Sequence, residues 1–391
     1  MESKSNQKKV HSLTGRITLP LLHKAFDNVR RNKGAAGIDK VSIEMFKANL
    51  EQNLLALMRD LKQGTFQPLA LRRVWIPKSP GQFRPLGIPA VRDRVAQEVL
   101  RLLLTPIFEP RFHDDSYGFR PKRNCHEALW RVLQLHEDGY VHVLDADIHG
   151  FFDNIPHHVI MNGLRAMVAD GNILNLIEKF LTSGVMESGQ WRPTSIGTPQ
   201  GGVISPLLAN IALDFLDWHL DELGYRFVRY ADDFVVLCQS ERQAQEALRV
   251  VQARLTELGL TLSPEKTRVT TFGKGYSFLG FDISSRSVRM RGKSVEKFKT
   301  TLRNVTRRSH NLDARVVTRL NQIVRGTANY FAAPFAQCVN LFRTLDRWLR
   351  MRLRCMKTKR KSRRDNWRIR LKHLRHWGVL YLSDFLPMPC S

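Results

Sequence analysis

The chain has 391 residues, enough for two or three domains with a sizeable core. Its 62 Lys and Arg residues against 36 Asp and Glu residues leave a formal net charge of +26, which indicates a polyanionic partner, nucleic acid before membrane. Five scattered cysteines exclude a disulfide framework and a Cys-x-x-Cys zinc site and suit a reducing cytoplasm, and no apolar run reaches transmembrane length.

The first hundred residues are predicted to form helices interrupted by one hairpin. Apolar residues recur at helical spacing in three stretches, at residues 21–31, 42–62 and 91–108. Between the second and the third, two short apolar segments flank the turn residues Ser79-Pro80-Gly81, which predicts a β-hairpin. Lys78 and Arg84 lie on the flanks of this hairpin. A single basic side chain in so basic a chain is as often a solvated surface charge as a ligand.

A buried strand with two carboxylates near its end comes next. Residues 115–123 form an irregular, aromatic and basic segment that includes Arg120. Residues 141–144 then have the pattern of a buried strand, and Asp147 falls just past its end. Asp145 has the same parity as Asp147 along a strand and could be mistaken for the ligand.

A glycine-rich stretch precedes the next predicted helix. Gly197, Gly201 and Gly202 would let the backbone approach a ligand closely. A helix is expected to begin at Ser205-Pro206, with Ser205 as its N-cap and Pro206 at its first position. A phosphate-binding loop is one interpretation, although the spacing is not that of a Walker A motif.

The most informative stretch is residues 228–237, where Asp232 and Asp233 interrupt two apolar runs. The pattern predicts two strands joined by a tight turn with these carboxylates at its tip. A polar turn is the commoner explanation of an isolated Asp-Asp pair. However, two like charges side by side on a hairpin repel unless a cation lies between them, and carboxylate oxygens are ligands that Mg²⁺ prefers. Asp147 is the candidate for the other half of such a site.

The last hundred residues are more basic. Residues 315–331 have a helical pattern, and residues 343–375 are dense in Arg and Lys, with only Asp346 and Asp365 opposing them. Three tryptophans are interleaved in that segment: Trp348, Trp367 and Trp377. A charge run is usually a solvated face, but tryptophans at helical separations favour ordered helices whose basic face follows a phosphate backbone. The sequence therefore predicts a nucleic-acid-binding tail.

In this order the motifs resemble those of reverse transcriptases, most closely the compact bacterial group II intron reverse transcriptase/maturase class, over about residues 20–380. Asp147 with Phe151-Phe152 resembles the first catalytic motif, and Tyr230-Ala231-Asp232-Asp233 resembles the second. The stretch around Pro199-Gln200-Gly201 resembles a third motif, whose glutamine packs on the nucleotide. The family places an aromatic gate five residues after its metal-binding Asp, which is Phe152 here and favours Asp147 over Asp145 as the ligand. Asp145 is then interpreted as a strand-end or structural carboxylate.

The resemblance implies an α+β fold of the right-hand polymerase type, with fingers, an antiparallel-sheet palm and a helical thumb. It implies RNA-directed DNA polymerisation by two-metal nucleotidyl transfer, with two Mg²⁺ ions, or Mn²⁺, at Asp147, Asp232 and Asp233. Ile148, the residue after Asp147, is included in the predicted metal site. Phe152 would fill the space of a ribose 2′-hydroxyl and favour dNTPs over NTPs.

The same resemblance assigns further contacts and the domains. The residues expected to bind the nucleotide are Lys78, Arg84, Phe152 and Gln200. Those expected to bind primer or template are Arg120, Lys266 and Gly280. The expected domains are an N-terminal extension (1–50), fingers and palm (51–285), a thumb or maturase domain (286–342) and a basic DNA- and RNA-binding tail (343–391).

The implied partners are a group II intron RNA, an RNA template, a DNA primer or target and dNTPs, in the bacterial cytoplasm and without a membrane. The protein would assist splicing of the intron and copy it in retrohoming. Larger relatives append a zinc-dependent nuclease with paired cysteines, and the cysteine spacing leads us to expect no such domain here. Two alternatives stay open: a maturase with vestigial polymerisation, which an intact set of three carboxylates weighs against, and a domesticated reverse transcriptase of phage defence, which a structured intron RNA around the gene would exclude.

Overall fold

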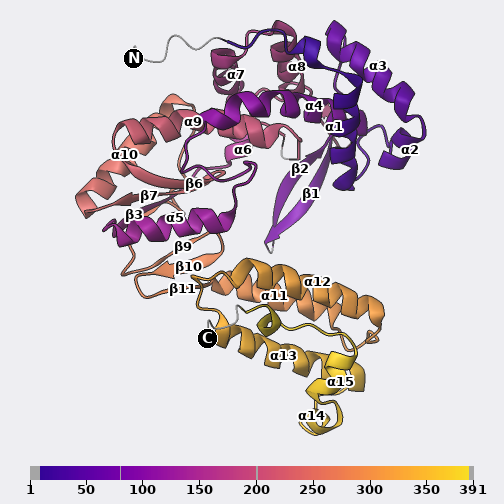
Figure 1. Cartoon of the computed structure of the whole chain (residues 1–391), viewed down its shortest axis with the longest axis vertical. Coiled ribbons are helices and arrows are strands. Elements are labelled where there is room, and N and C mark those ends of the chain that lie inside the picture. Colours follow the sequence, from indigo (N-terminus) through magenta and orange to yellow (C-terminus); the bar gives the residue numbers. More distant parts are fainter. Residues whose placement is uncertain (1–8, 80, 200, 387–391) are drawn as a thin grey trace. The chain divides into compact units, whose positions relative to one another are not determined.

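The computed structural model describes residues 9–79, 81–199 and 201–386, except for the side chains of Lys78 and Ser79. The chain divides into two compact units (Figure 1). Unit 1 comprises Met1–Leu135 and Leu144–Val269, and unit 2 comprises His136–Val143 and Thr270–Ser391. Each unit is described by itself below.

The predicted helices of the N-terminal third are confirmed, within a few residues at their ends. They are α1 (Leu19–Arg31), α2 (Ile43–Ala48), α3 (Leu50–Gln63) and α4 (Val91–Phe108). Two short 3₁₀ helices that were not predicted, η1 (Thr14–Arg16) and η2 (Glu109–Arg111), precede α1 and follow α4. The apolar face of α1 is buried as its spacing predicts, at Leu22, Phe26 and Val29. The Ser42 hydroxyl accepts a hydrogen bond from the amide of Met45, which explains why a helix starts there.

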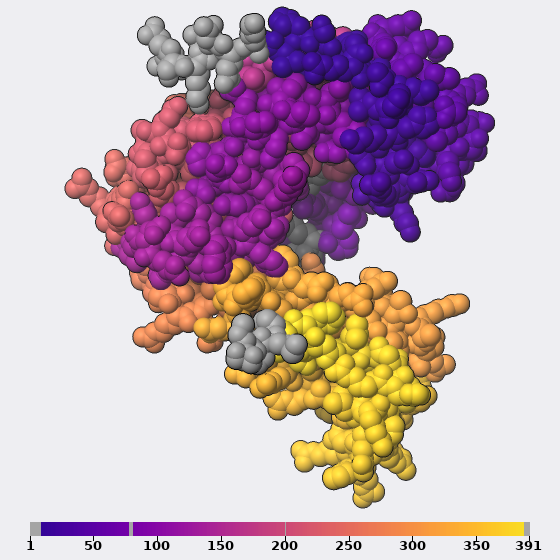
Figure 2. Space-filling model, viewed as in Figure 1, coloured from indigo at the N-terminus to yellow at the C-terminus, as the bar shows by residue number. Residues whose placement is uncertain are grey.

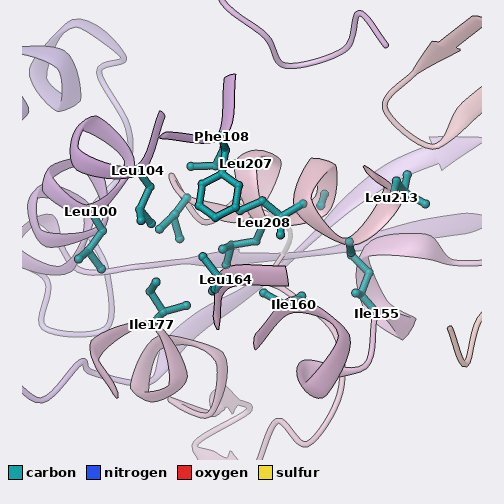
Figure 3. Packing of buried hydrophobic residues seen from close by; sticks show 14 of the residues in the cluster. Leu100, Leu104, Phe108, Ile155, Ile160, Leu164, Ile177, Leu207, Leu208 and Leu213 are labelled. Carbon is teal, nitrogen blue, oxygen red and sulfur yellow. The ribbon is translucent and has the colours of Figure 1, made fainter. Parts of the chain in front are cut away.

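Further helices follow up to residue 257, and all except the first contribute buried side chains to a hydrophobic core of unit 1. They are α5 (Cys125–Glu137), α6 (Phe151–Asn154), α7 (His157–Met167), α8 (Gly171–Leu181), α9 (Ser205–Glu222) and α10 (Glu241–Glu257). Figure 3 shows how side chains of α4, α7, α8 and α9 meet in this core, among them Leu104, Leu164, Ile177 and Leu208. Each of these four is at most 1% exposed. Burial of such side chains stabilises the fold by about 1.5–3 kcal/mol apiece.

Two sheets position the residues of interest. One has the strand order β2-β1-β4-β5 and contains the predicted hairpin, β1 (Leu71–Ser79) and β2 (Gln82–Ile88), with β4 (Val185–Glu187) and β5 (Gln190–Arg192). The other has the order β6-β7-β3-β8, from β6 (Arg226–Tyr230), β7 (Asp233–Cys238), β3 (His142–Asp147) and β8 (Arg268–Thr271). Figure 1 shows the β1–β2 hairpin extending away from the helices of unit 1.

Strand β3 is longer than the sequence suggested, because Asp147 is its last residue rather than a residue beyond its end. The reason is the alternation at its C-terminal end, where Ala146 is buried and its neighbours Asp145 and Asp147 are half-buried. Such alternation is the period of a strand, so the two carboxylates share one face. The expected apolar run covered only the first half of the strand.

Unit 2 is built from a small sheet and a group of helices. The sheet has the order β11-β10-β9, from β9 (Tyr276–Phe278), β10 (Phe281–Ser284) and β11 (Ser287–Met290). The helices are α11 (Gly292–Val305), α12 (Ala314–Phe331), α13 (Val339–Thr358), α14 (Asp365–Arg368), α15 (Leu371–His376) and η3 (Leu382–Phe385). The expected border between thumb and tail, at residues 342–343, falls inside α13.

The C-terminal segment is fastened to the long helices of unit 2. The carboxylate of Asp346 on α13, 1% exposed, accepts hydrogen bonds from the amides of Leu382 and Ser383 at 2.9 and 3.0 Å. Asn321 on α12 donates to the carbonyl of Gly378 and accepts from the amide of Leu380. In the space-filling view, the atoms of unit 2, coloured orange and yellow, lie against one another (Figure 2). Across the described ranges, no helix is both long and apolar enough to cross a bilayer.

Candidate active site

The predicted Asp-Asp hairpin is confirmed. Strands β6 and β7 pair antiparallel, and Tyr230 opposite Asp233 closes the ladder, so that Ala231 and Asp232 form a two-residue turn. Ala231 has a φ of +60°, which is uncommon for a residue with a side chain. Tight hairpin turns demand such a backbone, because only positive φ matches the twist of the flanking strands. The turn therefore presents two adjacent carboxylates at one end of a buried ladder.

Asp147 approaches this turn because β3 is the neighbour of β7 in the sheet. The pKa of Asp232 is raised, first by burial and then by the negative charge of Asp147. Burial raises the pKa of Asp233 to about 7, and the charges of Asp145, Asp232 and Asp147 add to this shift. Like charges that raise one another's pKa lie close together. The structure thus gathers four carboxylates at the ends of two neighbouring strands.

Basic side chains from the segment after β7 and α10 face two of these carboxylates. The amide of Ser263 donates to the carbonyl of Asp147 at 2.8 Å, which holds the following turn against β3. Lys266 Nζ then lies 2.7 Å from Asp147 Oδ2. Arg268 Nε lies 3.3 Å from Asp145 Oδ2, which suits the structural interpretation of Asp145. Ile148 is 1% exposed and forms an antiparallel bridge to Leu262.

The donor set of this cluster fits a divalent metal that is completed by a substrate. In the part of the chain that the structure describes, no group of three or more His, Cys, Asp or Glu side chains is arranged as a ready metal cage. Mg²⁺ commonly binds through one or two carboxylates and takes its other ligands from substrate phosphates and water. Burial and the negative charge of Asp147 raise the pKa values of Asp232 and Asp233, and this concentration of negative charge is what such an ion would neutralise.

A cavity of about 400 Å³ is lined by two of the predicted nucleotide-binding residues, Arg84 and Phe152. The other lining residues are Ile76, Leu86, Phe119, Pro199, Gly201, Gly202, Ser205 and Pro206. Phe152 is half-buried, whereas Phe151 is 2% exposed and belongs to the core. Gln200 and the side chain of Lys78 lie outside the described residues. The glycine-rich stretch and the hairpin β1–β2 therefore meet at one cavity.

Two residues that shape this cavity were not singled out from the sequence. Phe119 meets the Phe152 ring edge-on, with centroids 6.1 Å apart, and its φ of +60° cannot be inferred from composition. Gln97, a buried side chain of α4, accepts a hydrogen bond from the amide of Val203 at 2.7 Å. Gln97 is a polar residue on a helix whose side chains are largely buried, and this was the only feature that could have indicated its role at the cavity.

The start of α9 differs from the expectation for Ser205. The N-cap is Ile204 and Ser205 is already the first helical residue. The Ser205 hydroxyl donates to the carbonyl of Pro199 instead of accepting from the helix. The physical reason is Gln97, whose side-chain oxygen takes the amide of Val203 and fixes the loop before the helix. Capping by a distant side chain leaves no trace in local sequence.

The predicted primer and template residues have different surroundings. Arg120 is 7% exposed, and its guanidinium donates to Glu109, to the carbonyl of His113 and to that of Ser116. This geometry favours a structural role, and its contact with a template stays a prediction. Lys266 stands beside the carboxylates in unit 1. Gly280 belongs to unit 2, where its φ of +82° serves the turn between β9 and β10.

Two family models match the chain. The model described as "Reverse transcriptase (RNA-dependent DNA polymerase)" matches residues 76–283, more than half of the chain. The model described as "Group II intron, maturase-specific domain" matches residues 295–377. The first range includes the carboxylate cluster and the cavity beside it, and the second lies entirely in unit 2.

Curated proteins are also similar to this chain. Protein YkfC of Escherichia coli (strain K12) is 36% identical over 290 residues, which cover 64% of this chain and 76% of YkfC. The group II intron-encoded protein LtrA of Lactococcus lactis subsp. cremoris is 31% identical over 358 residues, which cover 73% of this chain and 59% of LtrA. Among solved structures, a chain of a partial Cas6-RT-Cas1–Cas2 complex aligns at a TM-score of 0.39 and 24% identity, over 63% of this chain and 41% of that one.

Proposed function

This chain belongs to the bacterial group II intron-encoded reverse transcriptases with a maturase domain, and from that premise we propose that it copies intron RNA into DNA at the Asp147, Asp232 and Asp233 cluster. The fold and the enzyme class expected from the sequence are confirmed by the family: a mixed α and β polymerase of the right-hand type and an RNA-directed DNA polymerase. The residues that carry out the reaction, the partners and the route of the product are our proposal.

Reverse transcriptases use divalent metal ions, and Asp147, Asp232 and Asp233 are the side chains that would hold them here. When bound, two Mg²⁺ ions would activate the primer 3′-oxygen and neutralise charge on the pyrophosphate leaving group. The chain itself contributes the positions of these carboxylates. Because the three carboxylates come from adjacent strands, their separation is fixed by the sheet before any substrate arrives.

The cavity beside the cluster would receive the incoming dNTP. Arg84 brings a positive charge to its edge, where the triphosphate needs cations beyond the metals. Phe152 lies in the same wall, and its ring is supported by Phe119 on one side and Phe151 on another. A ring fixed by two neighbours cannot move aside for a ribose 2′-hydroxyl. Selection of dNTPs over NTPs would follow from this steric exclusion.

Unit 2 supplies the surface for the RNA partner. The maturase-specific match covers α11 to α15, and this part of the chain carries the run of basic residues between 343 and 375. Such a surface suits the phosphate backbone of a structured RNA. We assign splicing assistance to this unit, polymerisation to unit 1, and copying of the intron into a DNA target, in the cytoplasm, to the two together.

The observation that carries the proposal is the cluster itself: Asp147 at the end of β3 lies beside Asp232 and Asp233 on the neighbouring hairpin, next to a cavity lined by Arg84 and Phe152. The test is extension of a DNA primer on an RNA template by the purified full chain with Mg²⁺ and dNTPs. Wild-type protein should extend the primer. A parallel assay should follow splicing of the RNA that copurifies with the protein. Splicing without extension would establish the maturase alternative and remove polymerisation from the proposal.

A further inference from the structure

Arg229 is the largest fully buried side chain in unit 1, and it immediately precedes the catalytic hairpin turn of Tyr230 to Asp233. Its guanidinium forms a bidentate ion pair with the carboxylate of Asp217 on α9, with Nε to Oδ1 at 2.7 Å and Nη2 to Oδ2 at 2.5 Å. Both groups are at most 1% exposed. Two paired donors fix the plane of the guanidinium, so its remaining N–H groups point in defined directions.

Those remaining donors are directed at the turn. Nη1 donates to the carbonyl of Ala231 at 2.9 Å and to Oδ1 of Asn210 at 3.0 Å. The Ala231 carbonyl belongs to the peptide that joins Ala231 to Asp232. Its orientation therefore sets the position of the Asp232 amide and Cα, and with them the direction of the Asp232 carboxylate. Ala231 itself holds a φ of +60°, a conformation that surrounding contacts must maintain.

The same network ties a second segment to the turn. Asn210 donates through Nδ2 to the carbonyl of Gly118 at 2.9 Å. A Cβ at Gly118 would lie 2.2 Å from the amide nitrogen of Ala231, so the two backbones are in direct contact. The backbone of Arg229 adds two bonds to this segment, from its own amide to the carbonyl of Asp115 and from the amide of Tyr117 to its carbonyl. The turn is thus held by the side chain of Arg229 and by the backbone of residues 115–118.

We propose that Arg229 is a positioning residue for nucleotidyl transfer: anchored by Asp217, it clamps the Ala231–Asp232 peptide and so directs the carboxylate of Asp232. This inference rests on the proposed function of the carboxylate cluster. If Arg229 served only to stabilise the fold, its pair with Asp217 would be sufficient. Such a buried pair is not even required for stability, because apolar groups can often replace it without loss. The donor pair on Nη1, directed at the turn and at its neighbour Asn210, is the feature that such a pair would not require.

The test begins with Arg229→Lys, which keeps the charge opposite Asp217 but has no planar fork to reach the Ala231 carbonyl at the same time. A carboxylate displaced by about 1 Å costs on the order of 10²-fold in rate, so we expect kcat for single-nucleotide addition to fall by about 10- to 100-fold. The KM for dNTP should change little, because the cavity lined by Arg84 and Phe152 is untouched. Arg101→Lys is the matched control, since Arg101 also forks onto a buried carboxylate, that of Glu98.

A second readout does not depend on activity or on metal. Amide hydrogen exchange at residues 230–234 of the metal-free protein should be faster in Arg229→Lys, while exchange in α4 and α9 should match the wild type. The Arg101→Lys control should leave residues 230–234 unchanged. If Arg229→Lys does not fold, Asn210→Ala takes its place, because it removes the second acceptor that helps direct Nη1 and leaves the pair with Asp217 intact. Exchange at residues 230–234 should again be faster than in the wild type, by less than in a variant without the bond to Ala231, and unchanged exchange would count against the clamp.

Rescue distinguishes a clamp from a general stabiliser. Glycine adopts positive φ without steric strain, so Ala231→Gly should make the turn less dependent on Arg229. The double variant should recover part of the kcat lost by Arg229→Lys, measured against Ala231→Gly alone. Normal exchange at residues 230–234 in the variant, or a loss of kcat equal to the loss of folded protein, would overturn the proposal. Failure of the wild type to extend any primer would instead overturn the proposed function, and exchange would still decide the clamp.

Discussion

Lys266 Nζ lies 2.7 Å from Asp147 Oδ2, so the first of the proposed metal ligands already has a cation from the chain beside it. The side chain of Lys266 is 57% exposed, and solvent-exposed pairs of this kind contribute about 0–1 kcal/mol. A divalent ion can therefore displace the ammonium at small cost. Asp145 differs, because it is paired to Arg268 and its side chain is only 15% exposed.

This difference predicts unequal effects at the two carboxylates of β3. Asp147→Ala should abolish extension of a DNA primer on an RNA template, because the metals lose a ligand that no neighbour replaces. Asp145→Ala should retain measurable extension, since its partner Arg268 can be solvated. RNA affinity should stay within a few fold in both variants, as these groups bind cations and not phosphates. An inactive Asp145→Ala beside an active Asp147→Ala would show that the ligand had been assigned to the wrong carboxylate.

Phe152 is predicted to control the choice of sugar. Phe152→Ala removes the ring from the wall of the cavity, and the ratio of NTP to dNTP incorporation should rise at least tenfold, about the effect of removing a steric clash of 1.4 kcal/mol. Phe151→Ala is the control, because Phe151 lies in the core and should lower stability without changing that ratio. An unchanged ratio in Phe152→Ala would assign Phe152 to the core as well.

If the basic segment of unit 2, residues 343–375, binds a phosphate backbone, the affinity for RNA should depend on salt concentration. Several of its lysines and arginines have structural contacts; for example, Lys359 bonds to Asn311 and Arg360 pairs with Asp365. Arg363 and Arg364 are exposed and are the better probes. If each contacts a phosphate, replacing both with Gln should lower the slope of log affinity against log salt by about two units.

The comparison for that experiment is the pair Arg242 and Arg249, exposed on α10 in unit 1. Their replacement by Gln lowers the net charge equally, so any difference between the two variants reports on position and not on total charge. Primer extension on a short preformed template should survive both changes. Equal slopes in the two variants would mean that Arg363 and Arg364 lie on a solvated face.

Asp93 on α4 predicts a pH dependence of stability in the absence of metal and substrate. It is 2% exposed, and burial raises its pKa from 3.8 to about 7. Between those two values the folded chain holds a proton that the unfolded chain has released, so the free energy of unfolding falls as the pH rises through this range and stays lower above pH 7. One oxygen, Oδ1, makes no hydrogen bond among the described residues.

Asp93→Asn should therefore lose this part of the pH dependence. The amide keeps an acceptor for the amide of Leu69 and carries no charge, so the variant should melt higher than the wild type at pH 8 and similarly at pH 4. Asp27→Asn, at a half-exposed position on α1, serves as the control and should follow the wild-type curve. Parallel melting curves for Asp93→Asn and the wild type from pH 4 to 8 would contradict the raised pKa.

The sequence predicted what depends on neighbours in the chain. The hairpin of β6 and β7 and the helix at 91–108 follow from apolar periodicity, and both were confirmed. The approach of Asp147 to Asp232 depends on strand order, which periodicity does not contain, and only the family resemblance supplied it. Contacts from distant side chains were missed for the same reason: Gln97 at the loop before α9 and Arg229 beneath the turn.

The order of strands in the catalytic sheet also bears on how the protein is made. Strand β3 lies between β7 and β8, yet both neighbours follow it in the chain, and β8 ends only at Thr271. At synthesis rates of about 5–20 residues per second, β3 waits roughly 6–25 s for its second partner. During that time its backbone is an open edge, the kind of surface that pairs with other chains. Nascent chains released before Thr271 should therefore be substrates for chaperones or proteases rather than partly active polymerases.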